Sequence, residues 1–248
     1  MSESNNNPPE PAPSNVASRT VAAGRGWDWI ADGFALFKLR PGIWILILIV
    51  FFVCCLLVSW VPLIGSLANI VLTEILAGGL MLGCRSLAGG GGLEVGHLFA
   101  GFSKNTSNLV VLGVLAVVGW VMVLFPAALI VGTGGVLAMM RGDVAGMMAL
   151  GLSFTLAALI VLALSVPLYM ALWFAPALIV LNGLEPMAAA KQSFIACLNN
   201  IVPFLVYGVI LLVLGIVAAI PFGLGFLVLG PVIIASVYTA YRDIFAAA

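Results

Sequence analysis

The stretch Leu184–Gly208 reads LEPMAAAKQSFIACLNNIVPFLVYG, and the architecture of the chain can be worked out from it. Its first part places apolar residues at three- and four-residue steps, the spacing of one helical face. At about 15 residues this helix is too short to cross a bilayer, so we expect it to lie in the membrane interface. Asn199 and Asn200 then form a polar turn that leads into a spanning helix. The predicted apolar face consists of Met187, Ala190, Phe194, Cys197, Leu198 and Ile201.

The composition places the rest of the chain in a membrane as well. Of its 248 residues, 64% are hydrophobic and 7% are charged, whereas soluble domains carry roughly 25% charged residues. The formal net charge is zero, which leaves no basic surface for nucleic acid. We therefore expect an all-α polytopic membrane helical bundle whose partners include membrane lipids and no nucleic acid.

Uncharged apolar runs predict six transmembrane helices within one membrane domain, residues 21–245. Trp44 and Trp60 lie near the two ends of the first run, as aromatic residues do at membrane interfaces. Residues 132–146 are expected to form a loop between the third and fourth spans. The spans are predicted at about 43–61, 66–87, 109–131, 147–181, 201–220 and 223–241.

The fourth run, residues 147–181, is too long for one upright helix and contains Pro167 and Pro176. It is either one long, kinked and tilted span or two spans. Charge distinguishes these alternatives, because cytoplasmic loops carry an excess of Lys and Arg. With six spans and a cytoplasmic N-terminus, Arg141 alone among nine basic residues faces outward, whereas seven spans divide them six to three. We therefore expect six spans with both termini in the cytoplasm.

The N-terminal forty residues divide into a tail and a first interfacial segment. Residues 1–20 are rich in Asn, Pro and Ser and contain no apolar core, so we expect a disordered cytoplasmic tail and no signal peptide. Residues 21–40 place large apolar side chains on one helical face. These side chains are Trp27, Ile30, Phe34 and Phe37.

The same organisation recurs in the chain. Residues 93–113, LEVGHLFAGFSKNTSNLVVLG, also run from an amphipathic segment through a polar turn into a span. Residues 27–41 have this organisation ahead of the first span, although they lack the asparagine. We predict an internal repeat of three units, each a surface helix followed by a helical hairpin. At one offset of 95 residues, Phe99, Asn105 and Gly113 match Phe194, Asn200 and Gly208.

Several motifs resemble those of a family of small, uncharacterised, proteobacterial six-span inner-membrane proteins. They are GWDWIADGFALFKLRPGIW, GCRSLAGG with GHLFAGFS, WFAPALIVLNGLEPMAAAKQSFIACLNNIVPFLVYG, and YRDIF. The resemblance covers about residues 20–245. More distantly, the chain is similar to the membrane domain fused to some glycerophosphodiester phosphodiesterases, without their soluble domain. The resemblance implies a multi-pass protein of the bacterial inner membrane and implies no catalytic residue.

Glu74 is the acidic residue that lies well inside a predicted span. An ionisable group at that depth is a functional candidate, because an unpaired charge there costs several kcal/mol. One interpretation is a proton-coupled step. The other is a protonated, structural carboxyl group that is hydrogen-bonded to Asn69, Thr73 or a neighbouring helix. The lack of a Lys, Arg or second carboxylate at similar depth favours the structural interpretation.

Three further candidates lie at the predicted cytoplasmic ends of the second and sixth spans. Arg242 and Asp243 could order the C-terminus, or Arg85 and Arg242 could bind lipid headgroups. Snorkelling of the arginines towards the interface is the simpler interpretation. The single histidine, His97, has no partner at metal-site or catalytic-triad spacing, so we expect no metal, no cofactor and no enzymatic activity.

Two functions remain open. The first is a non-catalytic membrane protein that organises lipids or partner proteins at the cytoplasmic face, which the surface helices suggest. The second is a small-solute transporter that uses Glu74 and the prolines inside the spans. Transporters usually gather polar groups near the midplane. Few such groups are visible in the sequence, so we rank transport second.

Overall fold

The computed structural model describes residues 16–62 and 64–245. Over these residues it contains nine α-helices, one 3₁₀-helix and no β-strand. Six helical segments are long and apolar enough to cross a membrane. The predicted all-α membrane bundle with six candidate spans is therefore confirmed.

The N-terminal part consists of α1 (Arg25–Leu39), α2 (Pro41–Ser59) and α3 (Ile64–Ala88). Pro41 opens α2, where its fixed backbone dihedral favours the first helical turn. The helices α2 and α3 lie within a few residues of the predicted spans 43–61 and 66–87. The predicted tail, residues 1–20, lies mostly outside the described residues. Its last five residues are described, and Arg19 among them hydrogen-bonds the Asp243 and Ile244 carbonyls of α9.

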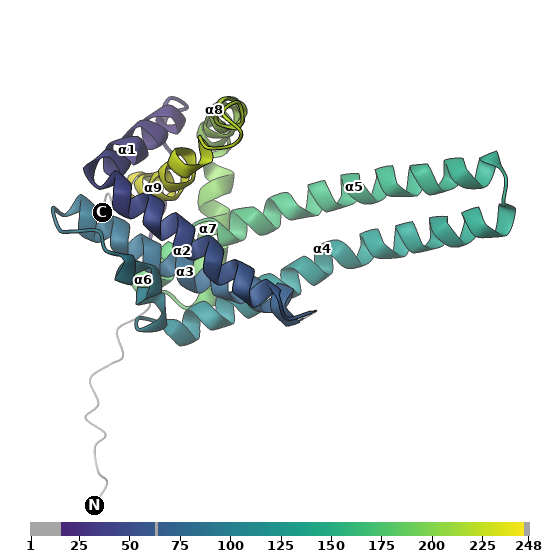
Figure 1. The fold of residues 1–248 in the computed structure, drawn as a ribbon, viewed down its shortest axis with the longest axis horizontal. Coiled ribbons are helices and arrows are strands. Elements are labelled where there is room, and N and C mark those ends of the chain that lie inside the picture. The colour runs from purple at the N-terminus through teal and green to yellow at the C-terminus, as the bar shows by residue number, and fades with distance from the viewer. Residues whose placement is uncertain (1–15, 63, 246–248) are drawn as a thin grey trace, which may run out of the picture.

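The middle part consists of the 3₁₀-helix η1 (Val95–Phe102), α4 (Thr106–Arg141), α5 (Val144–Leu172) and α6 (Ala175–Asn182). The helices α4 and α5 pack along each other and extend away from the other helices (Figure 1). The predicted loop at residues 132–146 is wrong, because a turn at Gly142 and Asp143 suffices to join α4 and α5. Gly142 ends α4 in the left-handed conformation, with φ of 60°. Asp143 caps α5 by accepting the Gly146 N–H at 2.8 Å.

Residues 132–135 include three glycines and lie in the segment predicted as a loop, but they continue α4. One of these glycines, Gly134, lies at the contact between α4 and α5. A glycine inside a helix is less favourable than alanine by only about 1 kcal/mol, so it does not end a helix by itself. A Cβ placed on Gly134 would lie 2.0 Å from the Ser153 hydroxyl oxygen of α5. The absence of a side chain at Gly134 therefore lets α4 and α5 approach closely.

The predicted single span over residues 147–181 is interrupted. The chain leaves the helical path at Trp173 and Phe174, between α5 and α6. Pro176 lies in the first turn of α6, and a proline cannot continue a preceding helix because it lacks an N–H donor. Ser193 of α7 satisfies the freed backbone groups. Its hydroxyl accepts the Phe174 N–H at 2.9 Å and donates to the Met170 carbonyl at 2.7 Å.

The C-terminal part consists of α7 (Pro186–Asn199), α8 (Ile201–Ala219) and α9 (Phe226–Phe245). The short helix predicted from Leu184–Gly208 is confirmed as α7. Gly183 adopts a left-handed conformation with φ of 72° and separates α6 from α7. Asn200 joins α7 to α8, at the position predicted for the polar turn.

The helix α7 packs on the bundle through small residues. Ala189, Ser193 and Ala196 are completely buried, whereas Met187 of the predicted apolar face is 64% exposed. The sequence predicted the apolar face but did not identify these small residues as the contact with the bundle. Lipid is as apolar as a protein interior, so small residues that allow close helix contact are favoured between membrane helices.

The helix α1 follows the same rule. Trp27 and Phe34 of its predicted apolar face are exposed, whereas Gly26 and Gly33 are buried. A Cβ placed on Gly26 would lie 2.4 Å from the Pro203 carbonyl oxygen of α8. The two glycines thus bring α1 into direct backbone contact with α8 and α9.

The short helices connect successive parts of the bundle. The 3₁₀-helix η1 packs against α3, α7 packs against α5 and α6, and α1 packs against α9 and α8. Each short segment therefore contacts the spans that precede it, and α1 contacts the last two spans. The first and last helices of the described chain lie together, as Figure 1 shows.

Candidate functional site

Glu74 lies in the middle of α3, ten residues after Ile64 and about 15 Å along the helix. The two side chains suggested as its partners are used elsewhere. Asn69 donates from its amide nitrogen to the Cys55 carbonyl at 3.0 Å and to the Ser59 hydroxyl at 2.6 Å. Thr73 donates to the Asn69 carbonyl at 2.7 Å, as a threonine commonly does within its own helix.

The Glu74 carboxyl group has neither a hydrogen bond nor an ion pair with any described residue. The structural interpretation, a carboxyl group satisfied by Asn69 or Thr73, is therefore wrong for these two partners. An unpaired polar group away from water is unfavourable by several kcal/mol if it is charged. Such a group needs a proton or a partner that the described chain does not supply.

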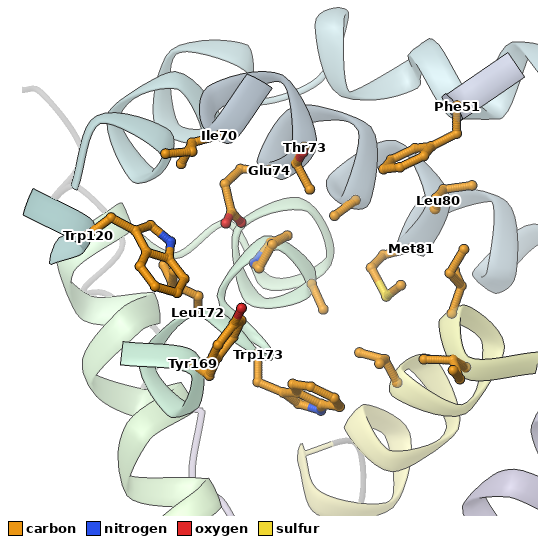
Figure 2. Close-up of a pocket in the computed structure, with 16 residues that line it drawn as sticks. Phe51, Ile70, Thr73, Glu74, Leu80, Met81, Trp120, Tyr169, Leu172 and Trp173 are labelled. Atoms are coloured by element: carbon orange, nitrogen blue, oxygen red, sulfur yellow. The ribbon is translucent and has the colours of Figure 1, made fainter. Parts of the chain in front are cut away.

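The carboxyl group points into a cavity of about 460 Å³ between α3 and the neighbouring helices (Figure 2). Trp120 of α4, Tyr169 of α5 and Trp173 after α5 lie on the side that faces Glu74. The Trp120 and Tyr169 rings pack edge to face, with centroids 5.4 Å apart. The remaining wall is almost entirely apolar and includes Phe51, Ile70, Leu80, Met81 and Ile234.

The break between α5 and α6 forms part of this cavity. Leu172 and Trp173 before the break and Pro176 and Ala177 after it all line the cavity. Trp173 also packs edge to face against Tyr207 of α8, with centroids 6.1 Å apart. The Trp173 indole N–H is buried and has no hydrogen-bond partner among the described residues. A discontinuous helix therefore borders the cavity that contains the unpaired carboxyl group.

A second cluster surrounds Asp243 at the end of α9. Its two carboxylate oxygens accept from Arg19 at 2.7 Å, from Arg25 at 2.6 Å and from the Trp29 indole N–H at 2.9 Å. The side chain of Asp243 is 6% exposed, whereas those of Arg19 and Arg25 are 53% and 39% exposed. Hydrogen bonding to Asp243 raises the pKa of the Arg25 guanidinium above its ordinary value. We call Arg19, Arg25, Trp29 and Asp243 the Asp243 clamp.

The Asp243 clamp holds the segment before α1 on the end of the bundle, together with Asn200. The Asn200 side chain is completely buried. Its oxygen accepts the Val21 N–H at 2.8 Å, and its nitrogen donates to the Arg19 carbonyl at 3.0 Å. The Arg19 N–H in turn donates to the Ile244 carbonyl at 3.0 Å.

Arg85 and Arg242 take no part in the clamp. Both side chains are exposed, and neither forms an ion pair with a described residue. The Tyr241 hydroxyl donates to the side-chain oxygen of Asn182. The sequence suggested that Arg242 and Asp243 together order the C-terminus. In the structure Asp243 instead binds Arg19 and Arg25, near the N-terminal end of the described chain.

The histidine and the cysteines show no arrangement typical of a catalytic or metal site in the described part of the chain. The His97 imidazole Nδ1 accepts the Glu94 N–H at 3.1 Å and so caps the start of η1. The four cysteines are free. Within the described ranges, no three side chains of His, Cys, Asp or Glu come together as metal ligands.

Several residues of both clusters could not be identified from the sequence. Trp120, Tyr169 and Trp173 belong to apolar runs in which an aromatic residue is unremarkable in composition, so nothing marked them as a shared wall. The pairing of Arg19 with Asp243 joins residues 224 positions apart. A signal was available only for Asn200, because its repetition of Asn105 singled it out.

The chain has a relative among known proteins. A probable inner membrane protein of Burkholderia thailandensis is 32% identical to it over 214 residues, which make up 82% of this chain and 77% of that protein. No family model and no solved structure matches the chain.

Proposed function

This chain belongs to the family of the probable inner membrane protein of Burkholderia thailandensis, and we propose that it is a non-catalytic carrier that binds a small solute at Glu74. The observation that carries the proposal is the unpaired Glu74 carboxyl group, which points into a cavity in the middle of a candidate span. Ligand pockets commonly combine an apolar wall with a small number of polar groups. Intramembrane ionisable residues mark solute or proton pathways.

The interrupted helix supports transport rather than static packing. Secondary transporters bind their substrates near the midplane, beside helices whose backbone is broken. Here the break at Trp173 and Phe174 borders the cavity, and its freed backbone groups bond the Ser193 hydroxyl and the Cys197 thiol of α7. Rotation at such a break would change access to Glu74 without unfolding a span.

The non-catalytic character of the proposal follows from the chemistry of the site. The cavity wall offers a carboxyl group, a phenol, two indoles and the Thr73 hydroxyl, which donates within its own helix, and no nucleophile paired with a base. The single histidine of the chain caps η1. Proton exchange at Glu74 is the chemical step that this wall can support.

Proteoliposomes containing the full chain test the proposal. We would load them with one cationic, one anionic and one neutral solute and measure efflux against protein-free vesicles. Protein-dependent flux of at least one class is expected, and Glu74→Gln should reduce it more than the packing control Leu76→Ala, which changes a buried residue outside the cavity. Equal flux with and without protein for all three solutes would contradict a carrier.

A second candidate function, the organisation of lipids at the cytoplasmic face, is favoured by Arg85 and Arg242. Both guanidinium groups are exposed and lack ion pairs among the described residues. The anionic headgroup of a lipid could form an ion pair with each of these guanidinium groups. Partner proteins could use the same surface.

Native mass spectrometry of the protein from mixed anionic and neutral vesicles would test lipid organisation. We expect retained anionic lipid to decrease when Arg85→Gln and Arg242→Gln are combined, and to persist in the control Arg141→Gln at the tip of the α4–α5 hairpin. Equal retention in all three proteins would rule out this role.

We further propose that the three-unit repeat underlies this architecture. Asn105 donates to the Ile179 carbonyl at 2.7 Å, seven residues before α7, and Asn200 donates to the Arg19 carbonyl, six residues before α1. The matched asparagines thus make the same kind of contact, each to the segment that leads into the next short helix. The packing of each short helix on the preceding spans supports the same grouping.

A further inference from the structure

We propose that the cavity around Glu74 takes a lipophilic monovalent cation, an amine or quaternary ammonium group carrying apolar substituents. This inference rests on the proposed solute binding and specifies the class of solute. The argument uses three properties of the wall: its charge, its aromatic faces and its lack of other oxygen ligands.

The charge of the wall selects a cation. Glu74 is the ionisable acid of the cavity, and neither Lys nor Arg is among the residues that line it. An ionised carboxylate at this depth is stabilised by an opposite charge in contact with it, because the low dielectric strengthens their attraction. One carboxylate balances one positive charge, so the site favours a monovalent cation over a dication and repels an anion.

The aromatic side chains suit an organic cation. Trp120, Tyr169 and Trp173 lie across the cavity from the Glu74 carboxyl group (Figure 2). The face of an aromatic ring attracts a cation, tryptophan most strongly, and recognition of quaternary ammonium groups by aromatic side chains is a common use of this attraction. A cation between Glu74 and these rings would contact a countercharge on one side and π-faces on the other.

The rest of the wall excludes small inorganic cations. Metal ions such as Mg²⁺ and Ca²⁺ need six or more oxygen ligands or retained waters. The cavity offers the Glu74 carboxyl group, the Tyr169 hydroxyl and the Thr73 hydroxyl, which already donates to Asn69. Aliphatic side chains such as Ile70, Leu80 and Ile234 form most of the remaining surface. A cavity of about 460 Å³ is within the size range of small-molecule sites.

Two probes of one shape separate charge from size. Benzyltrimethylammonium is a quaternary cation with one ring, and neopentylbenzene replaces its nitrogen by carbon and is neutral. Both would be titrated into the full chain in phosphatidylcholine nanodiscs by calorimetry, with empty nanodiscs subtracted. We expect the cation to bind and Glu74→Gln to weaken it by about tenfold or more, because the countercharge is lost. Binding of neopentylbenzene should change by less than about twofold, since it carries no charge.

Glu185→Gln is the matched control, because Glu185 is exposed and its side chain forms no cap at the start of α7. It should leave both affinities unchanged. Trp120→Leu keeps an apolar wall but removes one aromatic face. It should weaken the binding of the cation several-fold more than the binding of the neutral probe. This second variant tests the inference even if Glu74→Gln fails to fold.

The outcomes distinguish this inference from the proposed function. If both probes bind equally and Glu74→Gln affects neither, the cavity binds uncharged apolar solutes, and the cation inference is overturned while solute binding stands. If the cation does not bind to the wild-type chain, the inference also fails, and the flux of anionic and neutral solutes decides the carrier proposal separately.

Discussion

At the scale of single residues, buried polar side chains in this protein hold chain segments that are distant in sequence. Asp243 and Asn200 together bind the segment before α1, at Arg19 and Val21, and the start of α1, at Arg25 and Trp29. Each bond replaces one that water would make to the unfolded chain, so the net gain per bond is modest. The loss when one partner disappears is larger, because the remaining polar groups stay buried.

Asp243→Asn tests the clamp. The substitution keeps the shape of the side chain but removes the charge that two guanidinium groups share. We expect a loss of about 2 kcal/mol of stability, less than the 3–5 kcal/mol of a fully buried ion pair, because Arg19 and Arg25 are partly exposed to solvent screening. Thermal unfolding in detergent and limited proteolysis at residues 16–24 would measure the effect. Asp32→Asn, which changes an exposed acid on α1, is the control, and an equal effect there would refute the clamp.

The matched asparagines provide a residue-level test of the repeat. Asn200→Ala should destabilise the protein by about 2 kcal/mol, because it leaves the Val21 N–H and the Arg19 carbonyl unpaired. Asn105→Ala should cost a similar amount, partly because Asn105 has a φ of 56°, which is strained for alanine by about 1 kcal/mol.

Asn105→Gly separates the two contributions to that loss. Glycine adopts the left-handed conformation readily, so the loss should shrink towards that of the hydrogen bond to the Ile179 carbonyl alone. Thermal unfolding of the three variants side by side is the measurement. A loss at Asn200 with no loss at Asn105 would mean that the two positions are not equivalent.

At the scale of secondary-structure elements, the positions of helices could be predicted, and the residues through which the short helices contact their neighbours could not. Long apolar runs in α2, α3, α8 and α9 identified their spans to within a few residues, because hydrocarbon thickness sets the length of a spanning helix. For α1 and α7 the sequence predicted the large apolar residues of one face and an interfacial position, but it did not identify the residues that contact the other helices. Gly26, Ala189 and Ser193 occupy these buried positions, because small residues allow close contact between helices in lipid.

Of the candidate site, the sequence predicted Glu74 but not the cavity that surrounds it. Glu74 was identifiable because a carboxyl group in an apolar run is rare and unfavourable. Its cavity depends on aromatic residues from α4 and α5 and on the break near Pro176, which are brought together only by packing. The interruption at Pro176 rather than at Pro167 depends on Ser193 of α7, which supplies the lost hydrogen bonds.

Ser193→Ala therefore tests the element that borders the cavity. The variant leaves the Phe174 N–H without a partner in a completely buried position, and the Met170 carbonyl keeps the Cys197 thiol at 3.6 Å as a side-chain partner. We expect a loss of about 2 kcal/mol of stability and weaker solute binding, because the wall formed by Trp173 and Pro176 is displaced. Thermal unfolding and nanodisc calorimetry measure the two effects. Ser165→Ala is the control, since Ser165 bonds within its own helix and is outside the cavity; equal effects of the two variants would contradict this role for Ser193.

At the scale of the whole molecule, the α4–α5 hairpin extends well beyond the other helices (Figure 1). The 36 residues of α4 extend about 54 Å, whereas the hydrocarbon core is about 30 Å thick. Its tip is nevertheless apolar, with Met139, Met140, Met147 and Met148 at least 71% exposed. An apolar tip beyond the hydrocarbon would be unfavourable in water, so we expect the hairpin to cross the bilayer at a strong tilt with Arg141 and Asp143 at the far interface.

This geometry requires the two glycine turns to lie on opposite sides of the membrane. Gly142 joins α4 to α5 at the tip, and Gly183 joins α6 to α7 near the clamp. Because Arg141 is the basic residue expected outside, we predict that a reporter active only outside the cytoplasm works when fused at Gly142 and is silent at Gly183. A cytoplasmic reporter should show the reverse pattern. Activity of the external reporter at Gly183 would require a seventh crossing at the Trp173 break. It would then place Asp243 on the opposite side of the membrane from Arg19 and Arg25, which contact it at 2.7 and 2.6 Å.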